Sequence, residues 1–290
     1  MKFDKNTKIL IVGLGLIGGS YAKALSDNGY FVGAIDKKKS SVEYALKNGL
    51  IQVGETSVKK DFVKDFDLIV FALYPHDFIN WIKEYQSSIK SGALITDVTG
   101  VKSFVVENVQ KILRGDLEFV GAHPMAGKEV SGVENADSKI FVGANYIVTP
   151  TKRNTDENVQ AVQDLGRALG FERISSLSPE EHDETVGFLS HLTHCIAVSL
   201  MVSKKSHHLA EYTGDSFRDL TRIAKINDEM WSELFLANKD ELLKQMDLFE
   251  EKFNQLKEDI KNDNREKIRE TLRESTARRK VFDKDAKETK

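Results

Sequence analysis

Several features are scarce in this sequence, and each scarcity excludes a class of protein. The chain has one cysteine in 290 residues, so no disulfide can form within it, and a reducing, cytoplasmic compartment is expected. No uninterrupted apolar run approaches the ~20 residues of a membrane-spanning helix. The first residues lead directly into a candidate strand, without the apolar segment of a secretory signal. We therefore expect a cytoplasmic protein with no membrane partner.

An excess of charge of either sign is also missing. The chain has 42 Lys and Arg against 45 Asp and Glu, a formal net charge of -3, which gives no reason to expect nucleic acid as a partner. Hydrophobic residues make up 40% and charged residues 30%, as is ordinary for a folded globular protein. We expect no metal site. The length is sufficient for two modest domains.

The first half of the chain alternates between two local patterns. Short apolar runs bounded by turn residues indicate buried strands, and the segments between them have helical spacing. Such alternation predicts an α/β fold with a Rossmann-type, doubly wound parallel sheet. The expected strands are Lys8–Val12, Phe31–Ile35, Asp67–Leu73, Ala93–Val98, Phe119–Ala122, Asn145–Pro150 and Gly170–Ile174, with a helix over about Asp156–Leu169.

The pattern changes at Ser178. This serine can cap a helix, Pro179 occupies the first helical position, and two glutamates follow in the first turn. Beyond this point strand signals almost vanish, and no further proline occurs. We therefore place a domain boundary near Ser176. The prediction is a dinucleotide-binding domain at 1–176 and an all-α domain at 177–290.

A glycine-rich turn follows the first expected strand. In this Gly-x-Gly-x-x-Gly motif, Gly13 permits the tight turn, Gly15 lets the backbone approach a pyrophosphate, and Gly18 lets the helix pack closely on the strand. The free N–H groups at the start of the helix then face the phosphates. The alternative is a glycine-rich turn without a ligand, but the position between a strand and a helix favours a dinucleotide site.

The second expected strand ends in an acid, Asp36. A carboxylate there accepts hydrogen bonds from the adenosine ribose and repels a 2′-phosphate, which favours NAD over NADP. Lys37, Lys38 and Lys39 could attract such a phosphate, but we interpret them as a solvated helix start. The expected cofactor-binding residues are Gly13, Gly15, Leu16, Ile17, Gly18 and Asp36.

Polar residues then appear at three places where chemistry is plausible. His123 follows an expected strand end, and ligands of open parallel sheets bind beyond the carboxyl ends of strands. A neutral imidazole there can take the proton of a substrate alcohol while hydride leaves the same carbon. A purely structural histidine is the alternative reading.

The second place is the helix after Ser178. Asp183, Gly187, Ser190 and His194 lie at offsets that put them on one face of an α-helix. A polar stripe with a glycine in it indicates a wall against which another group packs closely. A helix–helix interface with satisfied polar groups would give the same spacing.

The third place is the segment that contains Arg222 and, nine residues on, Trp231. A guanidinium can bind both oxygens of a carboxylate through its planar fork, and on separate helices the two side chains could line one pocket. A surface arginine beside a packing tryptophan is the alternative.

Together these segments resemble the prephenate dehydrogenase family, from Lys8 to about Glu241. Many enzymes share the glycine loop, whereas the ordered combination of the other motifs is specific to this family. Those motifs are the Asp97–Lys102 segment, His123-Pro-x-Ala-Gly-x-Glu129, Ser178-Pro-Glu-x-His-Asp183, Ser190-His-Leu-x-His194, and Asp219-x-Thr-Arg-Ile-Ala224 with Trp231.

The resemblance implies a role for each matching residue. His123 would hydrogen-bond the 4-hydroxyl of prephenate, and Arg222 would hold a substrate carboxylate. His194 would contact the substrate with Ser190 nearby, which completes the expected catalytic group. The expected pocket and gate residues are Glu129 and Asp183 in a polar network, Trp231 in the pocket wall, and Thr99.

The sequence departs from the family at two turns. The family often has serine in a Gly-Ser-x-Lys turn that contacts substrate and nicotinamide, whereas this chain has Thr99 and Gly100 there. Thr99 can substitute, but Gly100 has no hydroxyl, so that role stays open. Some relatives have a glycine-rich turn that contributes across the dimer, and here Asp215 brings a charge to that turn.

The activity implied by the resemblance is NAD-dependent oxidative decarboxylation of prephenate to 4-hydroxyphenylpyruvate, in tyrosine biosynthesis. It also implies a homodimer built by the helical domain, with Glu250–Lys290 expected to form dimer helices and a solvated tail as the alternative. An arogenate dehydrogenase remains open, because no residue decides between the two substrates. A β-hydroxyacid dehydrogenase would require a catalytic lysine motif that is not evident. A non-catalytic NAD-binding sensor would require the His123–Arg222 set to be broken.

Overall fold

The computed structural model describes residues 1–205 and 208–282. It divides into two compact units, Met1–Lys239 and Asp240–Lys290, which we describe separately. The last residues of the predicted Glu250–Lys290 segment, 283–290, lie outside the described residues.

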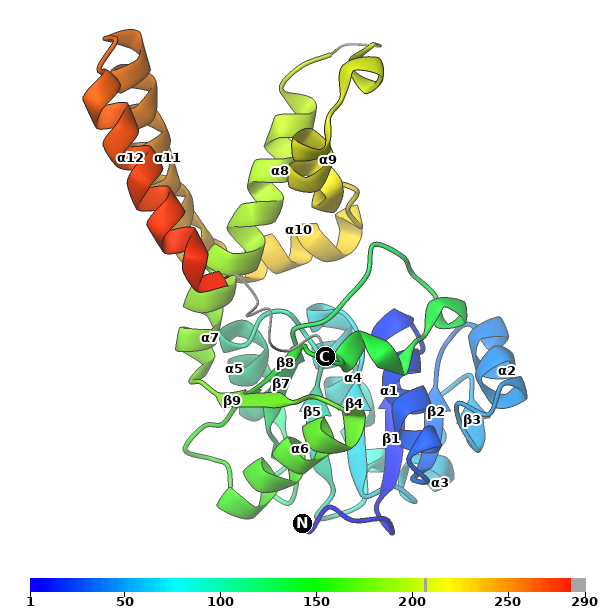
Figure 1. The fold of residues 1–290 in the computed structure, drawn as a ribbon. Helices are drawn as coiled ribbons and strands as arrows, with labels where there is room; N and C mark the ends of the chain where they lie inside the picture. Colours follow the sequence, from blue (N-terminus) through cyan, green and yellow to red (C-terminus); the bar gives the residue numbers. More distant parts are fainter. Residues whose placement is uncertain (206–207, 283–290) are drawn as a thin grey trace. The chain divides into compact units, whose positions relative to one another are not determined.

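The first unit is built around a six-stranded sheet with helices on both faces (Figure 1). The spatial order is β3-β2-β1-β4-β5-β6, and all pairings are parallel. This order confirms the predicted doubly wound sheet, whose two halves diverge from β1. The strands are β1 (Lys8–Val12), β2 (Phe31–Ile35), β3 (Val53–Glu55), β4 (Leu68–Phe71), β5 (Leu94–Asp97) and β6 (Glu118–Phe119).

The sequence makes this sheet because its strands are apolar on both faces. In β1, Ile9 and Ile11 belong to one core cluster and Leu10 and Val12 to the other, as the alternation of side chains along a strand requires. The connecting helices bury one side each. They are α1 (Leu16–Asp27), α2 (Lys39–Lys47), α3 (Lys60–Val63), α4 (Pro75–Tyr85) and α5 (Ser103–Ile112).

The predicted strand Phe119–Ala122 was wrong as a single element. The chain leaves the large sheet after β6 and enters a three-stranded sheet, in the order β7-β8-β9. The change follows from the pairing: Val120 N still donates to Ile95 O at 3.0 Å, but from Gly121 onward the backbone pairs antiparallel with β8. The strands of this second sheet are β7 (Gly121–Pro124), β8 (Asn145–Thr149) and β9 (Arg173–Ser176).

The predicted helix Asp156–Leu169 is confirmed as α6 (Asp156–Leu169). Thr155 caps its N-terminus by accepting a hydrogen bond from Asn158 N, and Gly170 ends it in the left-handed conformation at φ 96°. The edge strand β3 was not predicted, because its three residues carry little strand signal.

The predicted helix start at Ser178 is also confirmed. Its hydroxyl accepts from Glu181 N, and the Glu181 carboxylate accepts from Ser178 N, which forms a complete capping box. The helix continues as α7 (Pro179–Val186), a π-helical segment (Gly187–Leu192) and α8 (Thr193–Val202). Farther along the described part of this unit lie α9 (Asp215–Thr221) and α10 (Asp228–Ala237).

One continuous helix in the described part of the chain, Pro179–Val202, is long and apolar enough by composition to cross a membrane, with a mean hydropathy of 1.5 in its most apolar window. Helices at the core of water-soluble proteins meet the same criterion. This one carries the buried polar side chains of His182, Asp183 and His191, and ionisable groups are costly in lipid.

The second unit contains a helical hairpin of α11 (Lys239–Lys261, whose first residue ends the first unit) and α12 (Arg265–Arg279), side by side in Figure 1. Asp263 takes a left-handed conformation at φ 52° between them. The buried Asp259 carboxylate accepts hydrogen bonds from Gln255 and Asn264, both at 3.2 Å, which ties the turn to the helix. Helices were expected in this region.

Candidate active site

The glycine loop lies between the carboxyl end of β1 and the start of α1. Gly13 has φ 99°, donates to Ile35 O at 2.8 Å, and has Ala72 O only 2.4 Å from where a Cβ would be. A Cβ on Gly18 would be 1.9 Å from Gly13 O. At both positions the fold itself therefore requires glycine.

Gly15 differs from these two glycines. Its φ of -84° is open to any residue, and no atom lies within 4 Å of a Cβ built on it. It is the N-cap of α1 without a side-chain cap, and no acid occupies the first turn. The N–H groups of Leu16, Ile17 and Gly18 thus sit at an uncapped, positive helix end that faces open space, which fits a phosphate.

Asp36 fixes the other side of this loop. Its carboxylate accepts from Leu14 N at 2.6 Å and from Lys38 N at 2.7 Å, so backbone amides on both sides hold it. The remaining lone pairs of its oxygens can accept from ribose hydroxyls. Lys39 pairs with Glu43 at 3.3 Å, consistent with an exposed helix start.

A chain of side chains connects His123, on β7, with α7. His123 Nδ1 lies 2.8 Å from His182 Nε2, and His182 Nδ1 lies 2.8 Å from Asp183 Oδ1. Burial, followed by the neighbouring His182 and Lys102, holds the pKa of His123 well below its usual range. Burial also lowers the pKa of His182, although the Asp183 hydrogen bond opposes the change. His123 is therefore a neutral imidazole near neutral pH.

The Asp183 carboxylate is held at the N-terminus of α5. It accepts from Lys102 N and Ser103 N, both at 2.8 Å. Burial alone would raise the pKa of Asp183, but His182 and these two amides lower it. Asn238 Nδ2 donates to Asp183 O at 2.9 Å, which ties the end of α10 to α7.

A fully buried ion pair lies beneath this chain. Lys102 Nζ contacts Asp97 Oδ2 at 2.6 Å, and both side chains are 0% exposed. Asp97 Oδ1 also accepts from Ala122 N at 3.0 Å, which fixes β7 next to β5. The Thr99 hydroxyl donates to Asp97 Oδ2 and accepts from Lys102 Nζ, so its hydrogen bonds are made inside the protein.

Gly100 lies beside His123. A Cβ built on it would be 3.8 Å from His123 Cε1 and 3.5 Å from the Leu234 methyls, ordinary contact distances. The space next to the imidazole is therefore open to a small side chain that this sequence does not supply.

A second group is built by α8 and α10. The His194 ring stacks on Trp231 with centroids 3.7 Å apart, and its Nδ1 lies 2.8 Å from Ser190 O. Because a carbonyl only accepts, Nδ1 carries the proton and Nε2 is left as an acceptor. Burial lowers the pKa of His194. Trp231 and Leu234 share α10, so this group adjoins the Gly100 turn.

Arg222 forms an ion pair with Glu129, and the two side chains are 64% and 38% exposed. Both groups act electrostatically on His194, which places them at the rim of the same site. The sequence analysis assigned no role to His182, Asp97 or Lys102, although all three lie in the motifs that it quoted. The adjacent His182-Asp183 pair was visible as a signal, whereas nothing local indicates that Lys102 is buried.

The π-helical segment separates the four residues that were predicted to share one helix face. Asp183 and Gly187 are buried, whereas Ser190 and His194 are half-buried. His191 is buried and its Nδ1 lies 3.3 Å from Asn238 Nδ2. No cluster of three or more metal-ligating side chains occurs in residues 1–205 and 208–282.

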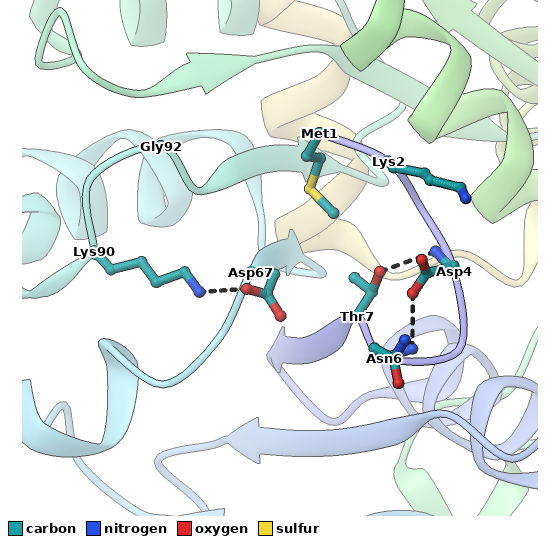
Figure 2. A pocket seen from close by; sticks show the side chains of 8 residues that line it. All are labelled: Met1, Lys2, Asp4, Asn6, Thr7, Asp67, Lys90 and Gly92. Carbon is teal, nitrogen blue, oxygen red and sulfur yellow. Dashed lines mark hydrogen bonds and ion pairs between the residues drawn. The ribbon is translucent and has the colours of Figure 1, made fainter.

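Figure 2 shows a pocket of a different kind, at the amino ends of the strands. Ligands of open parallel sheets bind at the opposite edge. Its main charges are already used, since Lys90 pairs with Asp67, which also accepts from Lys8 N at 2.8 Å. We do not consider it a candidate site. Its lining residues are Met1, Lys2, Asp4, Asn6, Thr7, Asp67, Lys90 and Gly92.

Two family models match the chain. One, described as the nucleotide-binding domain of prephenate dehydrogenase, matches residues 21–173, and the other, described as its dimerization domain, matches residues 178–274. The prephenate dehydrogenase of Bacillus subtilis is 34% identical over 249 residues, 82% of this chain. The chain spans about two thirds (66%) of that relative's length.

Solved structures agree with these matches. The prephenate dehydrogenase of Aquifex aeolicus in complex with hydroxyphenyl propionate and NAD+ superimposes with a TM-score of 0.87 at 34% identity, covering 96% of this chain and 98% of that one. The arogenate dehydrogenase of Synechocystis gives a TM-score of 0.81 at 25% identity, covering 96% and 100%.

The two kinds of loop glycine give a matched pair of variants. Gly18→Ala forces a methyl against a backbone oxygen and should lower the free energy of unfolding by about 3 kcal/mol or more. Gly15→Ala should change it by less than about 1 kcal/mol, yet weaken NADH binding about tenfold or more. Chemical denaturation and fluorescence titration measure the two effects. Unchanged NADH affinity in Gly15→Ala would show that no phosphate approaches this glycine.

The buried His191 predicts acid sensitivity. Burial lowers its pKa to about 4, so between about pH 6.5 and pH 4 the unfolded chain binds a proton that the folded chain does not, and stability falls as the pH falls. From about pH 7 to about pH 5, the wild type should lose about 2 kcal/mol more unfolding free energy than His191→Gln. Urea titrations at both pH values measure this, with the exposed His208→Gln as the control. Equal losses in wild type and His191→Gln would contradict the prediction.

Proposed function

The chain belongs to the prephenate dehydrogenase family, and from this premise we propose that it oxidises and decarboxylates prephenate to 4-hydroxyphenylpyruvate with NAD, as a step of tyrosine biosynthesis. The observation that carries the proposal is the buried His123 imidazole near the carboxyl end of β7, hydrogen-bonded to His182. The Aquifex relative, which binds NAD+ and hydroxyphenyl propionate, has the same fold over nearly the whole chain.

The glycine loop and Asp36 would hold the dinucleotide. The amides of Leu16, Ile17 and Gly18 bind the pyrophosphate across the open face of Gly15, and the Asp36 carboxylate binds the ribose. The same carboxylate disfavours a 2′-phosphate, which supports NAD over NADP. When bound, NAD supplies the hydride acceptor for the ring carbinol carbon.

His123 acts as the base. Its Nδ1 is engaged with His182, so Nε2 accepts the proton of the 4-hydroxyl as that carbon loses hydride. The ring carboxylate then leaves as carbon dioxide, and the electrons of the broken C–C bond make the ring an aromatic phenolate. The phenolate oxygen takes the proton back from His123 Nε2, which gives the hydroxyl of the product. Because burial keeps His123 neutral, it can accept this proton at physiological pH.

Arg222 and the wall of α8 and α10 position the substrate. The Arg222 guanidinium binds a substrate carboxylate, and Glu129, its ion-pair partner in the structure, gives way when the substrate enters. His194 contributes its bare Nε2 near Ser190, and Trp231 forms the wall on which His194 stacks. Asp183 supports His123 through its hydrogen bond to His182. Thr99 supports the site through its contacts with the buried Asp97–Lys102 pair.

Oxidation of arogenate is the second candidate. It is favoured by the similarity of the fold to the Synechocystis arogenate dehydrogenase. The first experiment is dinucleotide reduction with prephenate and with arogenate, each offered NAD and NADP. Rapid turnover of prephenate with NAD supports the main proposal, and rapid turnover of arogenate supports the second. No turnover, with NAD still bound, would favour a non-catalytic sensor.

We further propose a cytoplasmic homodimer, with the domain boundary near Ser176. The family model over residues 178–274 describes a dimerization domain, and the chain exposes large apolar side chains within it. They include Met201 and Val202 on α8 and, in the second unit, Leu243, Met246, Phe249 and Phe253 on α11. A second copy would cover such surfaces.

Replacing the base should affect the chemical step. His123→Asn is expected to lower kcat by roughly 10²–10⁴-fold, the usual contribution of a positioned acid–base group, with NAD binding unchanged. Steady-state kinetics measure this, and His208→Asn, at an exposed histidine of the same unit, serves as the control. Near-normal turnover in His123→Asn would contradict the assignment.

Replacing the carboxylate partner should affect substrate binding. Arg222→Gln is expected to raise KM roughly tenfold to a hundredfold, since a charge-assisted hydrogen bond contributes about 1.5–3 kcal/mol. Arg218→Gln is the matched control. Arg218 lies on α9, pairs with Asp215 of the same helix, and is similarly exposed, at 63%. An unchanged KM in Arg222→Gln would remove Arg222 from the site.

A further inference from the structure

A buried chain of hydrogen bonds ends at His123, and the positions of its protons follow from the structure. The two links, Asp183 to His182 and His182 to His123, are each 2.8 Å long. Asp183 is 2% exposed and His182 is 0% exposed. These hydrogen bonds join α7 to β7, so the relative position of two segments that are distant in the sequence depends on them.

The starting point is the Asp183 carboxylate. Oδ1 accepts from Lys102 N and Oδ2 accepts from Ser103 N. A backbone N–H can only donate, so both carboxylate oxygens must act as acceptors. The same carboxylate therefore requires His182 to present a protonated Nδ1 to it.

The remaining protons follow in sequence. Lys102 and Asp97 lie beneath the histidines, and the Lys102 ammonium opposes positive charge on either ring, as does His191 for His123. His182 is neutral, so its protonated Nδ1 leaves Nε2 bare. That bare nitrogen accepts from His123, which must then carry its own proton on Nδ1. His123 Nε2 is consequently bare.

Within residues 1–205 and 208–282, hydrogen bonding fixes this imidazole at one point. The hydrogen bond to His182 is the one that the His123 side chain makes in the described part of the chain. Gly100, the nearest turn residue, presents no side chain, and the Thr99 hydroxyl is turned toward Asp97. Orientation of the base therefore depends on His182.

We propose that Asp183 and His182 are positioning residues that hold His123 in the tautomer whose Nε2 can accept the substrate proton. The inference rests on the proposed role of His123 as the base. When the hydroxyl proton moves to Nε2, His123 becomes an imidazolium. Its Nδ1–H bond to His182, itself bonded to Asp183, stabilises the new charge, and no further proton has to leave the ring.

The tautomers can be observed directly, without substrate. In ¹⁵N-histidine-labelled full-length protein, long-range ¹⁵N–¹H spectra should show His123 and His182 both protonated at Nδ1. Asp183→Asn places an amide NH₂ where a backbone N–H donates, so its hydrogen-bonding pattern must change. An NH₂ turned toward Ser103 N would leave an oxygen on His182 and keep both tautomers and kcat. An NH₂ turned toward His182 Nδ1 would switch both histidines to the Nε2–H form, with kcat lower by about 10²–10⁴-fold and KM within about threefold. The same spectra show which of the two occurs.

A second pair of variants covers the case in which Asp183→Asn does not fold. His182→Gln offers an amide oxygen that can accept from His123 Nδ1, whereas His182→Met is apolar and of similar size. We expect His182→Gln to keep kcat within about tenfold of wild type and His182→Met to lose about 10²-fold or more. A role in packing alone would make the two variants alike.

The outcomes separate this inference from the proposed function. Three results would overturn the inference while leaving the activity in place. They are His123 protonated at Nε2 in the wild type, full turnover by Asp183→Asn with both histidines switched to Nε2–H, and equal kcat in the two His182 variants. A wild type that shows the expected tautomers but reduces NAD with neither prephenate nor arogenate would overturn the proposed function instead.

Discussion

The carboxylate of Asp183 is the group on which the arrangement of the site depends. It lies on α7, accepts from the first amides of α5, and reaches β7 through His182. The carbonyl of the same residue accepts from Asn238 at the end of α10. Leaving a buried charge without its partner costs about 3–5 kcal/mol. A single side chain thus makes the positions of these helices and of the base mutually dependent.

The fold was largely predictable because its signals are local. β1 and β2 are continuous apolar runs, and both have the predicted bounds. Ser178 marks a helix start by its own side chain, as predicted. The expected strand Gly170–Ile174 was wrong in its bounds, because Gly170 ends α6 and β9 begins at Arg173. The division of Phe119–Ala122 between two sheets could not be read in this way, because it depends on whether Ile95 or Thr149 pairs with each residue. Such choices are made by residues far away in the sequence.

The site was less predictable than the fold, for the same reason. His123, Arg222 and Asp36 stood out by residue type and by their place after strands or within motifs. The structure pairs Arg222 with Glu129 across 93 positions and the amide of Lys102 with Asp183 across 81. No pattern in a short window contains these pairs. The buried Lys102–Asp97 pair is the extreme case, since composition alone favours an exposed lysine.

The π-helical turn at Gly187–Leu192 has a consequence for how such chains are compared. A π-turn is equivalent to one residue inserted into an α-helix, so everything after it is rotated by ~100° relative to a regular helix. This rotation lets one unbroken helix direct Asp183 toward the buried base and His194 toward Trp231. A homologue that lost the inserted residue would keep the helix, but an alignment without a gap there would pair residues that face different directions. Insertions and deletions are usually sought in loops, and here the position that needs one lies in the middle of a helix.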